Sequence, residues 1–242
     1  MTDGIYLGDA YELIKKIPDK SIDLIVTGPP YDFKGICGIF KDAKATRAKT
    51  YTDILDKNLN KSIDLSILNE FCRVLKRINL YIWCNKEQIK GYLDYFLAKD
   101  CLFDIIIWAK VNPIPFLSRN YLKDKEYCLF FKEKGVPLHI TYETGKTVYL
   151  SQKNVEDRKK YDHPTIKPIN IIKNLIENSS NEGDIVLDPF CGSGTTCVAA
   201  KELGRHYIGF EIDEEYYTIS CDRLDGVTQR EKETGYSQIS LF

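Results

Sequence analysis

The sequence predicts an α/β fold with a largely parallel sheet, and two observations support that prediction. Short apolar runs alternate along the chain with segments whose apolar residues follow the helical period. One run, SIDLIVT at 21–27, is apolar on both faces, which is typical of a strand in a parallel sheet that helices cover on both sides. Strands and helices in alternation indicate that the helices cross over between parallel strands.

The first half of the chain places its elements on either side of a long polar segment. IYLGD at 5–9 predicts a short strand, and AYELIKKI at 10–17 predicts the helix that follows it. After the strand at 21–27, residues 32–60 are polar and lack periodicity, so we expect a long loop, of a length that is usually functional or disordered. Where apolar spacing resumes, we expect helices at 62–77 and 86–99 and strands at 79–84 and 103–110.

The second half combines a hairpin with further alternating elements. EYCLFFKEKGVPLHITYE at 126–143 predicts a hairpin that turns at Lys134–Gly135. Residues 144–162 have no clear pattern and are expected to be irregular. Pro168 suits the start of one helix, and Gly204 suits the end of another. The remaining elements are expected as helices at 168–179, 194–204 and 213–224 and strands at 184–190 and 206–212.

Length and composition predict one globular domain over residues 1–225, followed by a polar, flexible tail at 226–242. No apolar run reaches the ~18–20 residues that span a bilayer, and the N-terminus lacks a secretory signal. We therefore expect a cytoplasmic protein without a membrane partner. The eight cysteines stand singly, with no C-x-x-C pair, and are expected to be free buried thiols rather than metal ligands.

The net charge of −1 excludes a protein that is basic overall, yet two segments carry a local excess of basic residues. Five lysines and arginines stand against one acid between Lys34 and Lys49, and five stand against two acids between Lys146 and Lys160. Such runs are usually solvated faces, but on loops they also suit contacts to phosphate groups.

The stretch DIVLDPFCGSGTTCVAAKELGRHYIGFEID, from residue 184, is the most informative. It predicts a strand, a glycine-bearing turn, a helix and a second strand that ends in an acid. Gly192 and Gly194 in the turn let the backbone approach a ligand. Glu211 follows Gly192 by 19 residues, the spacing of the ribose-binding acid in nucleotide-binding βαβ units. Asp188 disfavours a pyrophosphate and suits a cation such as the ammonium of S-adenosylmethionine (AdoMet). The pattern favours AdoMet over NAD; simple helix-on-strand packing is the alternative.

TGPPY at 27–31, HPTIKP at 163–168 and DPFCGSGTT at 188–196 together resemble the DNA methyltransferases that modify exocyclic amino groups. Their order is similar to that of the β group of this family, and the resemblance covers about residues 4–224. It implies a Rossmann-like, circularly permuted methyltransferase fold with a mainly parallel seven-stranded sheet and helices on both faces. It also implies AdoMet as methyl donor and double-stranded DNA as substrate.

The same resemblance assigns the cofactor contacts. Asp188 would bind the methionine amine, and Glu211 would bind the ribose hydroxyls. Asp9 would approach the cofactor adenine, and Thr165 and Lys167 would hold the carboxylate end. The full set of expected cofactor-binding residues is Asp9, Ala10, Thr165, Lys167, Asp188, Phe190, Gly192, Gly194, Thr195 and Glu211.

The TGPPY segment is predicted to be the catalytic loop, with Gly28, Pro29, Pro30 and Tyr31 as its residues. An amino group conjugated with a ring reacts only when acceptors in a dry pocket draw its lone pair out of conjugation. The Pro29 carbonyl can be one acceptor, and Tyr31 offers a face on which a flipped base can stack. No cysteine is placed to act as a nucleophile, which argues against methylation at cytosine C5.

Gly28 departs from the family, whose members usually carry Asp, Asn or Ser at this position as the second acceptor. Losing such an oriented group typically costs ~3–4 kcal/mol, or ~10²–10³ in rate. Three interpretations stay open. Thr27, Asp32 or a water substitutes for it; the enzyme is weak or inactive and acts as a binding protein; or the chain carries an engineered change.

We expect methylation at adenine N6, because WAKVNPIP, KEYCLFF and HPTIKP resemble adenine-modifying members of the β group. Cytosine-N4 methylation is the second hypothesis, and a non-catalytic protein that binds AdoMet and DNA is the third. Core packing is an equal alternative for Trp108. The expected base-side residues are Tyr31, Asp32, Phe33, Trp108, Asn112 and Pro113.

Residues 33–60 and 133–162 are expected to be the DNA-recognition loops, with their basic side chains on phosphates. Both are short, so the enzyme is expected either to form a homodimer or to read a short site. The tail ends in QISLF, Gln238–Phe242, which is similar to the peptide that docks bacterial proteins on the replication sliding clamp. Leu241 and Phe242 would bury their side chains there; folding back on the domain is the alternative.

Overall fold

The computed structural model describes residues 2–31, 63–113, 121–152, 160–161 and 166–227. Some assignments made from the sequence lie outside these ranges. They are Asp32, Phe33, Thr165, the whole recognition segment 33–60 and the clamp-like peptide Gln238–Phe242.

Eight strands form one sheet. They are β1 (Gly4–Leu7), β2 (Leu24–Thr27), β3 (Asn79–Cys84), β4 (Leu102–Lys110), β5 (Lys125–Lys132), β6 (Val148–Ser151), β7 (Ile185–Asp188) and β8 (His206–Glu211). The order is β1-β8-β7-β2-β3-β5-β4-β6, and neighbours are parallel except where β5 pairs with β3 and β4. The mainly parallel sheet is confirmed, but the expected number of seven strands is wrong, because β6 adds an eighth at the edge.

β6 lies in the segment 144–162 that was expected to be irregular. Four residues are too few for a periodic signal, and the strand is visible only through its parallel pairing with β4, where Trp108 lies opposite Tyr149. Val148 and Leu150 are 54% and 71% exposed, as befits an edge strand. The sequence pattern failed here because tertiary pairing, and not burial, defines the strand.

The hairpin predicted for 126–143 is only half present. β5 forms, and the chain turns at Gly135, where φ is +83°. Residues 136–147 form no strand. The physical reason is that β3 and β4 occupy both edges of β5, so the returning segment has no free backbone edge to pair with.

Helices follow the predicted order with shorter bounds. α3 ends early because Leu75 adopts extended backbone and forms a bridge with Ile22. The helices are α1 (Ala10–Leu13), continued by the 3₁₀ turn η1 (Ile14–Lys16), α3 (Ile67–Val74), α4 (Ile89–Leu97), α6 (Ile169–Ser179), α7 (Thr195–Glu202) and α8 (Glu214–Asp225). None of the helices in the described part of the chain combines the length and the apolar character that crossing a membrane requires.

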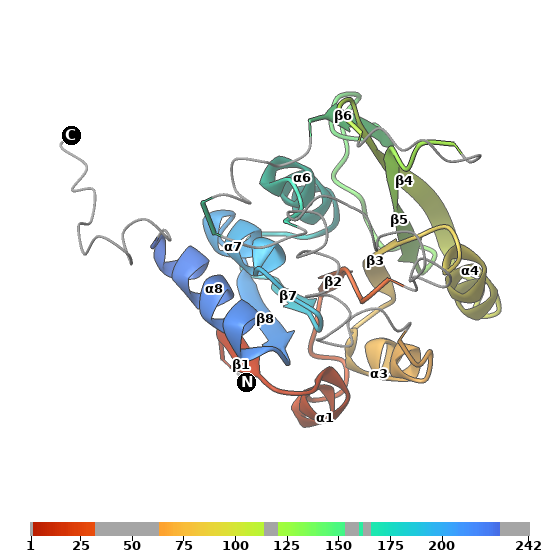
Figure 1. Cartoon of the computed structure of the whole chain (residues 1–242). Coiled ribbons are helices and arrows are strands. Elements are labelled where there is room, and N and C mark those ends of the chain that lie inside the picture. The colour runs from red at the N-terminus through yellow and green to blue at the C-terminus, as the bar shows by residue number, and fades with distance from the viewer. Residues whose placement is uncertain (1, 32–62, 114–120, 153–159, 162–165, 228–242) are drawn as a thin grey trace.

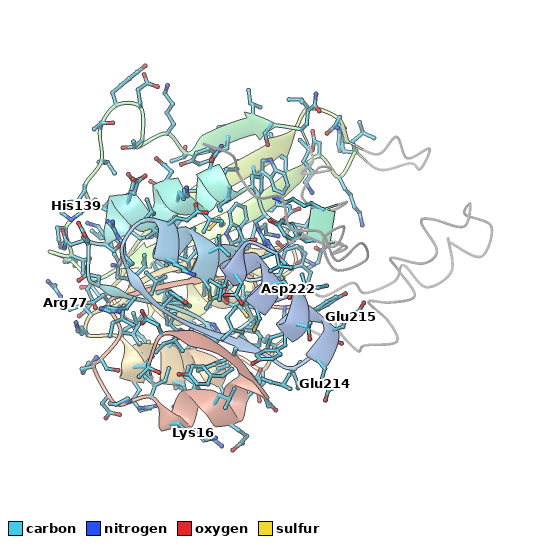
Figure 2. All side chains as sticks on the ribbon, turned by 90° about the vertical axis from the view of Figure 1, so that its left-hand side faces the viewer. Lys16, Arg77, His139, Glu214, Glu215 and Asp222 are labelled. Atoms are coloured by element: carbon cyan, nitrogen blue, oxygen red, sulfur yellow. The ribbon has the colours of Figure 1, made fainter. Side chains whose placement is uncertain are left out.

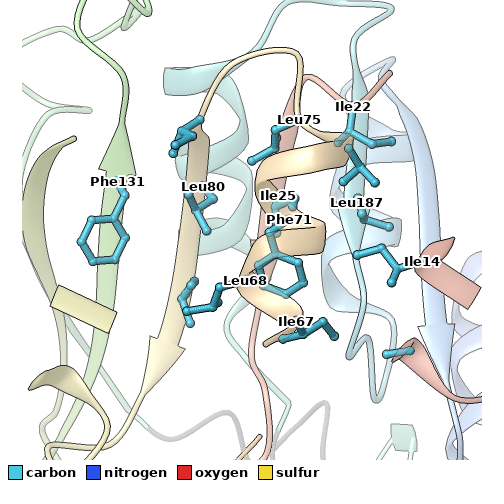
Figure 3. Packing of buried hydrophobic residues seen from close by; sticks show 14 of the residues in the cluster. Ile14, Ile22, Ile25, Ile67, Leu68, Phe71, Leu75, Leu80, Phe131 and Leu187 are labelled. Atoms are coloured by element: carbon cyan, nitrogen blue, oxygen red, sulfur yellow. The ribbon is translucent and has the colours of Figure 1, made fainter. Parts of the chain in front are cut away.

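The helices cover both faces of the sheet, as predicted (Figure 1). α1, α3 and α4 pack on one face, and α6, α7 and α8 pack on the other. Figure 3 shows the first face, where Phe71 of α3 lies over Ile25 and Leu80 of the sheet, all fully buried. Burying each such side chain stabilises the fold by about 1.5–3 kcal/mol.

The first and the last strand of the described chain are neighbours in the sheet. β1 near the N-terminus pairs in parallel with β8 near the C-terminus, so the red and blue ends of the colour scale are neighbours in Figure 1. β7 pairs in turn with β2. A glycine turn late in the sequence and a proline loop early in the sequence are thereby brought together, as the permuted order requires.

Candidate active site

Two loops leave the sheet at the same edge. β2 and β7 are parallel, with Ile25 opposite Leu187, so the chain after both strands emerges at their carboxyl ends. A pocket of about 80 Å³ lies there, and it contains six of the predicted site residues. Its lining is Thr27, Gly28, Trp83, Lys167, Ile172, Asp188, Phe190, Cys191, Gly192, Ser193, Thr195 and Thr196.

A larger open hollow of about 470 Å³ lies at the opposite, amino ends of β7 and β8, beside Ile185 and His206. Its polar lining is confined to Thr2 and the ion pair of Asp3 with His206. Size alone would favour this hollow, but the smaller pocket holds the convergent polar groups that a binding site needs.

The turn after β7 adopts a conformation that requires glycine. Gly192 and Gly194 have φ values of +50° and +73°. A Cβ on Gly194 would lie 2.9 Å from the Ser220 Cβ of α8. Arg223, buried on the same helix, donates from Nη1 to the Ser193 Oγ at 3.0 Å. α8 therefore fixes the turn from behind, a support that the motif itself does not reveal.

Asp188 ends β7 and is buried. Its Oδ1 accepts hydrogen bonds from the Thr27 hydroxyl at 2.7 Å and from the Phe190 backbone N–H at 3.1 Å. Burial raises the pKa of Asp188 to about 6, although these hydrogen bonds act in the opposite direction. A carboxyl group in this state gains charge stabilisation from a cation beside it, so the site suits an ammonium group.

Glu211 ends β8, next to β7. Its Oε2 accepts from the Gly192 backbone N–H at 2.8 Å, and its Oε1 accepts from the Asp213 N–H at 2.9 Å. Burial raises the pKa of Glu211 despite these bonds. Each carboxylate oxygen has a second lone pair, so the group can hold the turn and still accept from hydroxyl groups.

The turn between β1 and α1 lies beside the end of β8. The Gly8 backbone N–H donates to the Glu211 carbonyl at 2.8 Å. Asp9 caps α1 by accepting from the Tyr11 N–H at 2.9 Å, and Ala10 is the buried first residue of that helix. Asp9 and Ala10 therefore lie beside the carboxyl end of β8, and their contact with the cofactor adenine stays a prediction.

Tyr31 lies among charged side chains. Its hydroxyl donates to the Glu126 Oε2 at 3.1 Å, and the Lys167 Nζ donates to both of these groups, at 3.0 and 2.6 Å. Lys167 also lies 5.1 Å from the centroid of the Tyr31 ring. The tyrosine is therefore fixed by both its ring and its hydroxyl, and burial raises its pKa well above the usual range.

Glu126 of β5 joins this cluster to Lys110 of β4. The Lys110 Nζ donates to the Glu126 Oε1, the carboxylate oxygen that Lys167 does not bond. Burial acts to raise the pKa of Glu126, but Lys167 and Lys110 outweigh it and lower the pKa to about 2. The carboxylate is therefore fully ionised between two lysines. Lys167, expected at the cofactor carboxylate, lines the pocket but is already bonded to Glu126 and Tyr31.

The proline loop, Gly28–Tyr31, is anchored at Pro30, whose carbonyl accepts from the Gln88 Nε2 at 3.0 Å. Pro29 is buried. Among the described residues, a Cβ on Gly28 would meet only the Trp83 Cβ, at an ordinary 3.6 Å, and Gly28 has no left-handed φ. The backbone therefore does not require glycine at this position.

Trp108 belongs to the core rather than to the pocket lining. It is 3% exposed, and its Nε1 donates to the Ser151 Oγ of β6 at 2.7 Å. Lys110 lies 4.8 Å from the ring centroid and links it to Glu126. Asn112 and Pro113 follow β4, with Asn112 exposed, and neither lines the pocket.

A sequence model of the DNA methylase family (N6_N4_Mtase) matches residues 22–222. The chain belongs to this family of DNA methylases. The membership confirms the resemblance to amino-methyltransferases that the three motifs predicted.

Individual relatives and solved structures support the same family and fold. The chain is 29% identical to the type II methyltransferase M.HinfI of Haemophilus influenzae, over 91% of this chain and 67% of that protein. A crystal structure of M1.HpyAVI with SAM, which is AdoMet, is 28% identical, with a TM-score of 0.66 over 91% of this chain and 98% of that one. The cytosine-N4-specific PvuII DNA methyltransferase has a TM-score of 0.68 over 92% of this chain and 86% of that one, at 19% identity, which supports the fold alone. These likenesses confirm the Rossmann-like methyltransferase fold.

Sequence reasoning missed several residues of the site. Glu126 on β5 and Gln88 at the start of α4 lack a motif, and only the tertiary structure brings them to the proline loop. Trp83 was seen only as part of a strand, although Thr27 lies opposite Ile82 in the paired strands, which puts Trp83 beside Gly28. A tryptophan at the carboxyl end of a strand was the one available signal.

Proposed function

We propose that this methylase transfers a methyl group from AdoMet to an exocyclic amino group in double-stranded DNA, with adenine N6 as the target. The observation that carries the proposal is the shared pocket, which Gly28 of the proline loop and Asp188 of the cofactor turn line together. The choice of adenine rests on the resemblance of WAKVNPIP, KEYCLFF and HPTIKP to adenine-modifying relatives. The reaction would take place in the cytoplasm.

The residues present fit AdoMet. Asp188 offers a buried carboxyl group for the ammonium, and Glu211 offers lone pairs for the ribose hydroxyls. The glycine turn brings the Gly192 backbone into the pocket lining, and Gly194 of the same turn packs against Ser220 of α8 with no space for a Cβ. When bound, AdoMet supplies a sulfonium methyl group open to attack by a nitrogen lone pair.

The protein's part in the reaction is to present that lone pair. The Tyr31 ring, held by Lys167 and Glu126, gives the flipped base a fixed stacking face. The Pro29 carbonyl would accept one amino hydrogen and draw the nitrogen out of conjugation. Once the nitrogen carries the methyl group, its surplus proton would leave to solvent.

DNA would approach away from α8. Figure 2 shows Glu214, Glu215 and Asp222 along this helix, and the first two are exposed. Such an acidic face repels phosphates, whereas residues 33–60 and 133–162 carry the basic excess and are proposed as the recognition loops.

Incubation with labelled AdoMet and mixed-sequence DNA, followed by nucleoside digestion and mass spectrometry, tests the proposal. We expect N6-methyladenine. N4-methylcytosine without N6-methyladenine would select the cytosine alternative. Calorimetric binding of AdoMet with no transfer, even at high enzyme concentration, would identify the non-catalytic alternative.

Gly28→Asp tests whether a second acceptor is missing. An added Cβ meets no described atom closer than the Trp83 Cβ at 3.6 Å, so we expect faster methyl transfer, by up to ~10²–10³, measured as single-turnover rate. Gly28→Ala is the matched control, because it fills the same space without an acceptor and should give no gain. An aspartate variant no faster than the alanine variant would show that another group already serves as acceptor.

A further inference from the structure

Two charged side chains hold the cofactor turn, residues 188–194 between β7 and α7, from opposite sides. The Glu211 Oε2 at the end of β8 accepts from the Gly192 backbone N–H at 2.8 Å. The Arg223 Nη1 of α8 donates to the backbone carbonyl of Ser193, the next residue, at 2.5 Å. An anion thus bonds a backbone donor of the turn and a cation bonds a backbone acceptor, and charge-assisted bonds are roughly twice as strong as neutral ones.

The same nitrogen of Arg223 also bonds two side chains of the pocket wall. Nη1 donates to the Ser193 Oγ at 3.0 Å and to the Thr195 Oγ1, at the start of α7, at 2.9 Å. Both of these side chains are buried, and both line the pocket. Each hydroxyl accepts from the arginine through a lone pair, so its own proton points away from the guanidinium group. Arg223 therefore fixes the backbone of the turn and the direction of its hydroxyl groups together.

Burial shows that Arg223 is more than a space-filling residue. Its side chain is 7% exposed, and a buried cation costs free energy that an apolar side chain of similar size would avoid. The Tyr161 ring covers the guanidinium group, with its centroid 5.0 Å from the Arg223 Cζ. Tyr161 stands two residues before HPTIKP, so Arg223 contacts both the cofactor turn and the segment that leads to this motif.

A second arginine has similar bonds in a place without a ligand site. Arg205 donates from Nε to the Ser180 Oγ at 3.2 Å, and from Nη1 and Nη2 to the carbonyls of Leu203 and Ser180 at 2.6 and 2.9 Å. It precedes β8, at the amino end of that strand, and none of its acceptors lines the pocket beside the cofactor turn. Arg205 therefore represents an arginine that stabilises the fold alone.

We propose that Arg223 is a positioning residue for AdoMet binding, which holds the cofactor turn in its binding conformation before the cofactor arrives. It acts through Ser193 and Thr195 and does not itself line the pocket. The assignment rests on the proposed function. Because the turn is already formed in the free protein, AdoMet binding does not have to supply the free energy of ordering it.

Calorimetry of AdoMet binding to Arg223→Met tests this role. Methionine keeps an unbranched apolar stem and loses the N–H donors, so a smaller fraction of molecules has the turn in its binding conformation. We expect AdoMet to bind about 10- to 100-fold more weakly. Arg205→Met is the matched control: urea denaturation should show a comparable loss of stability, and AdoMet affinity should stay within about twofold of the natural protein.

Hydrogen exchange measured by mass spectrometry follows the turn directly, in the peptide that spans Pro189 to Cys197. In the natural protein without AdoMet this peptide should exchange slowly, because the N–H groups of Cys191, Gly192 and Gly194 are all bonded. In Arg223→Met it should exchange faster, and in Arg205→Met it should not change. The measurement on the natural protein does not depend on a variant folding.

The outcomes separate the two proposals. Unchanged AdoMet affinity in Arg223→Met, or equal weakening in both arginine variants, would overturn the positioning role and leave the proposed function standing. Rapid exchange of the turn in the free natural protein, abolished by AdoMet, would show that the cofactor forms the turn and would overturn the role as well. Failure of the natural protein to bind AdoMet would overturn the proposed function and, with it, this assignment.

Discussion

In the cofactor half of the site, built on β1, β8 and β7, Gly192 bonds to Glu211 across 19 residues of sequence. In the base half, built on β3, β5 and β4, Tyr31 bonds to Glu126 and Lys167 across 95 and 136 residues. The Gly192–Glu211 bond joins a turn to the next strand, whereas the Tyr31 bonds join segments far apart in the chain. The cofactor half also depends on distant residues, because Thr27 donates to Asp188 across 161 residues and β1 pairs with β8. The comparison indicates that a short motif reveals the glycine turn, whereas only the whole sheet reveals the Tyr31 cluster.

The two halves also differ in electrostatics. Asp188 is a buried acid whose pKa is raised to about 6, because burial outweighs its hydrogen bonds and the charge of Lys167, and a cationic ligand would offset that burial. Glu126 is a buried acid whose pKa is lowered to about 2, because Lys110 and Lys167 already balance it against burial. The cofactor half is therefore completed by its ligand, and the base half is complete in the protein alone.

Glu126→Ala should have the largest effect on stability. It leaves Lys110 and Lys167 without their shared carboxylate in a site where each side chain is 16–17% exposed. We expect a loss of about 3–5 kcal/mol in the free energy of unfolding, measured by urea denaturation. Glu143→Ala is the matched control: its pair with Lys146 is largely exposed, so the loss should stay below about 1 kcal/mol. Similar losses of unfolding free energy in both variants would contradict the conclusion that Glu126, Lys110 and Lys167 balance one another's charges in the folded protein.

Gly194→Ala should disrupt the cofactor half more selectively. The left-handed backbone costs about 1–2 kcal/mol, and the clash with Ser220 adds about 1–3 kcal/mol. Gly183→Ala shares the left-handed φ, +82°, but has no atom within 4 Å of the added Cβ, so it isolates the backbone cost. Urea denaturation and AdoMet calorimetry should show that only Gly194→Ala weakens AdoMet binding. Retained affinity in that variant would refute the role of the turn.

The pH dependence of AdoMet affinity should show the smallest effect. Because the folded pKa of Asp188 is raised above its unfolded value, the free native protein takes up a proton as pH falls through 6, and its stability falls as pH rises through that range. An ammonium ligand favours the ionised form, so AdoMet should bind about tenfold more weakly at pH 5 than at pH 7, below the ~8 at which an α-amino group itself titrates. Glu126, with a pKa of about 2, stays ionised throughout.

Calorimetry across this pH range, with Asp188→Asn as control, checks the expectation. The asparagine variant should bind AdoMet weakly and with no dependence on pH between 5 and 7. A natural protein with constant affinity over the same range would show that Asp188 does not meet the ammonium as a titrating group.

The sequence by itself determined the local units. It predicted the α/β class, the turn with Gly192 and Gly194, the acids Asp188 and Glu211 at strand ends, and the proline loop. These features follow from side-chain periodicity and from backbone conformations that only certain residues adopt, and both are properties of short segments. The family followed from the same motifs.

Only the tertiary structure decided which strands are neighbours. Periodicity shows which face a side chain takes and not which strand lies beside it, so β6, the missing hairpin strand and the Glu126 cluster could not be foreseen. Pairing of β2 with β3 brings Trp83 to Gly28, and pairing of β5 with β4 brings Glu126 to Lys110. The acceptors and donors that complete the pocket are thus set by contacts between segments far apart in the chain.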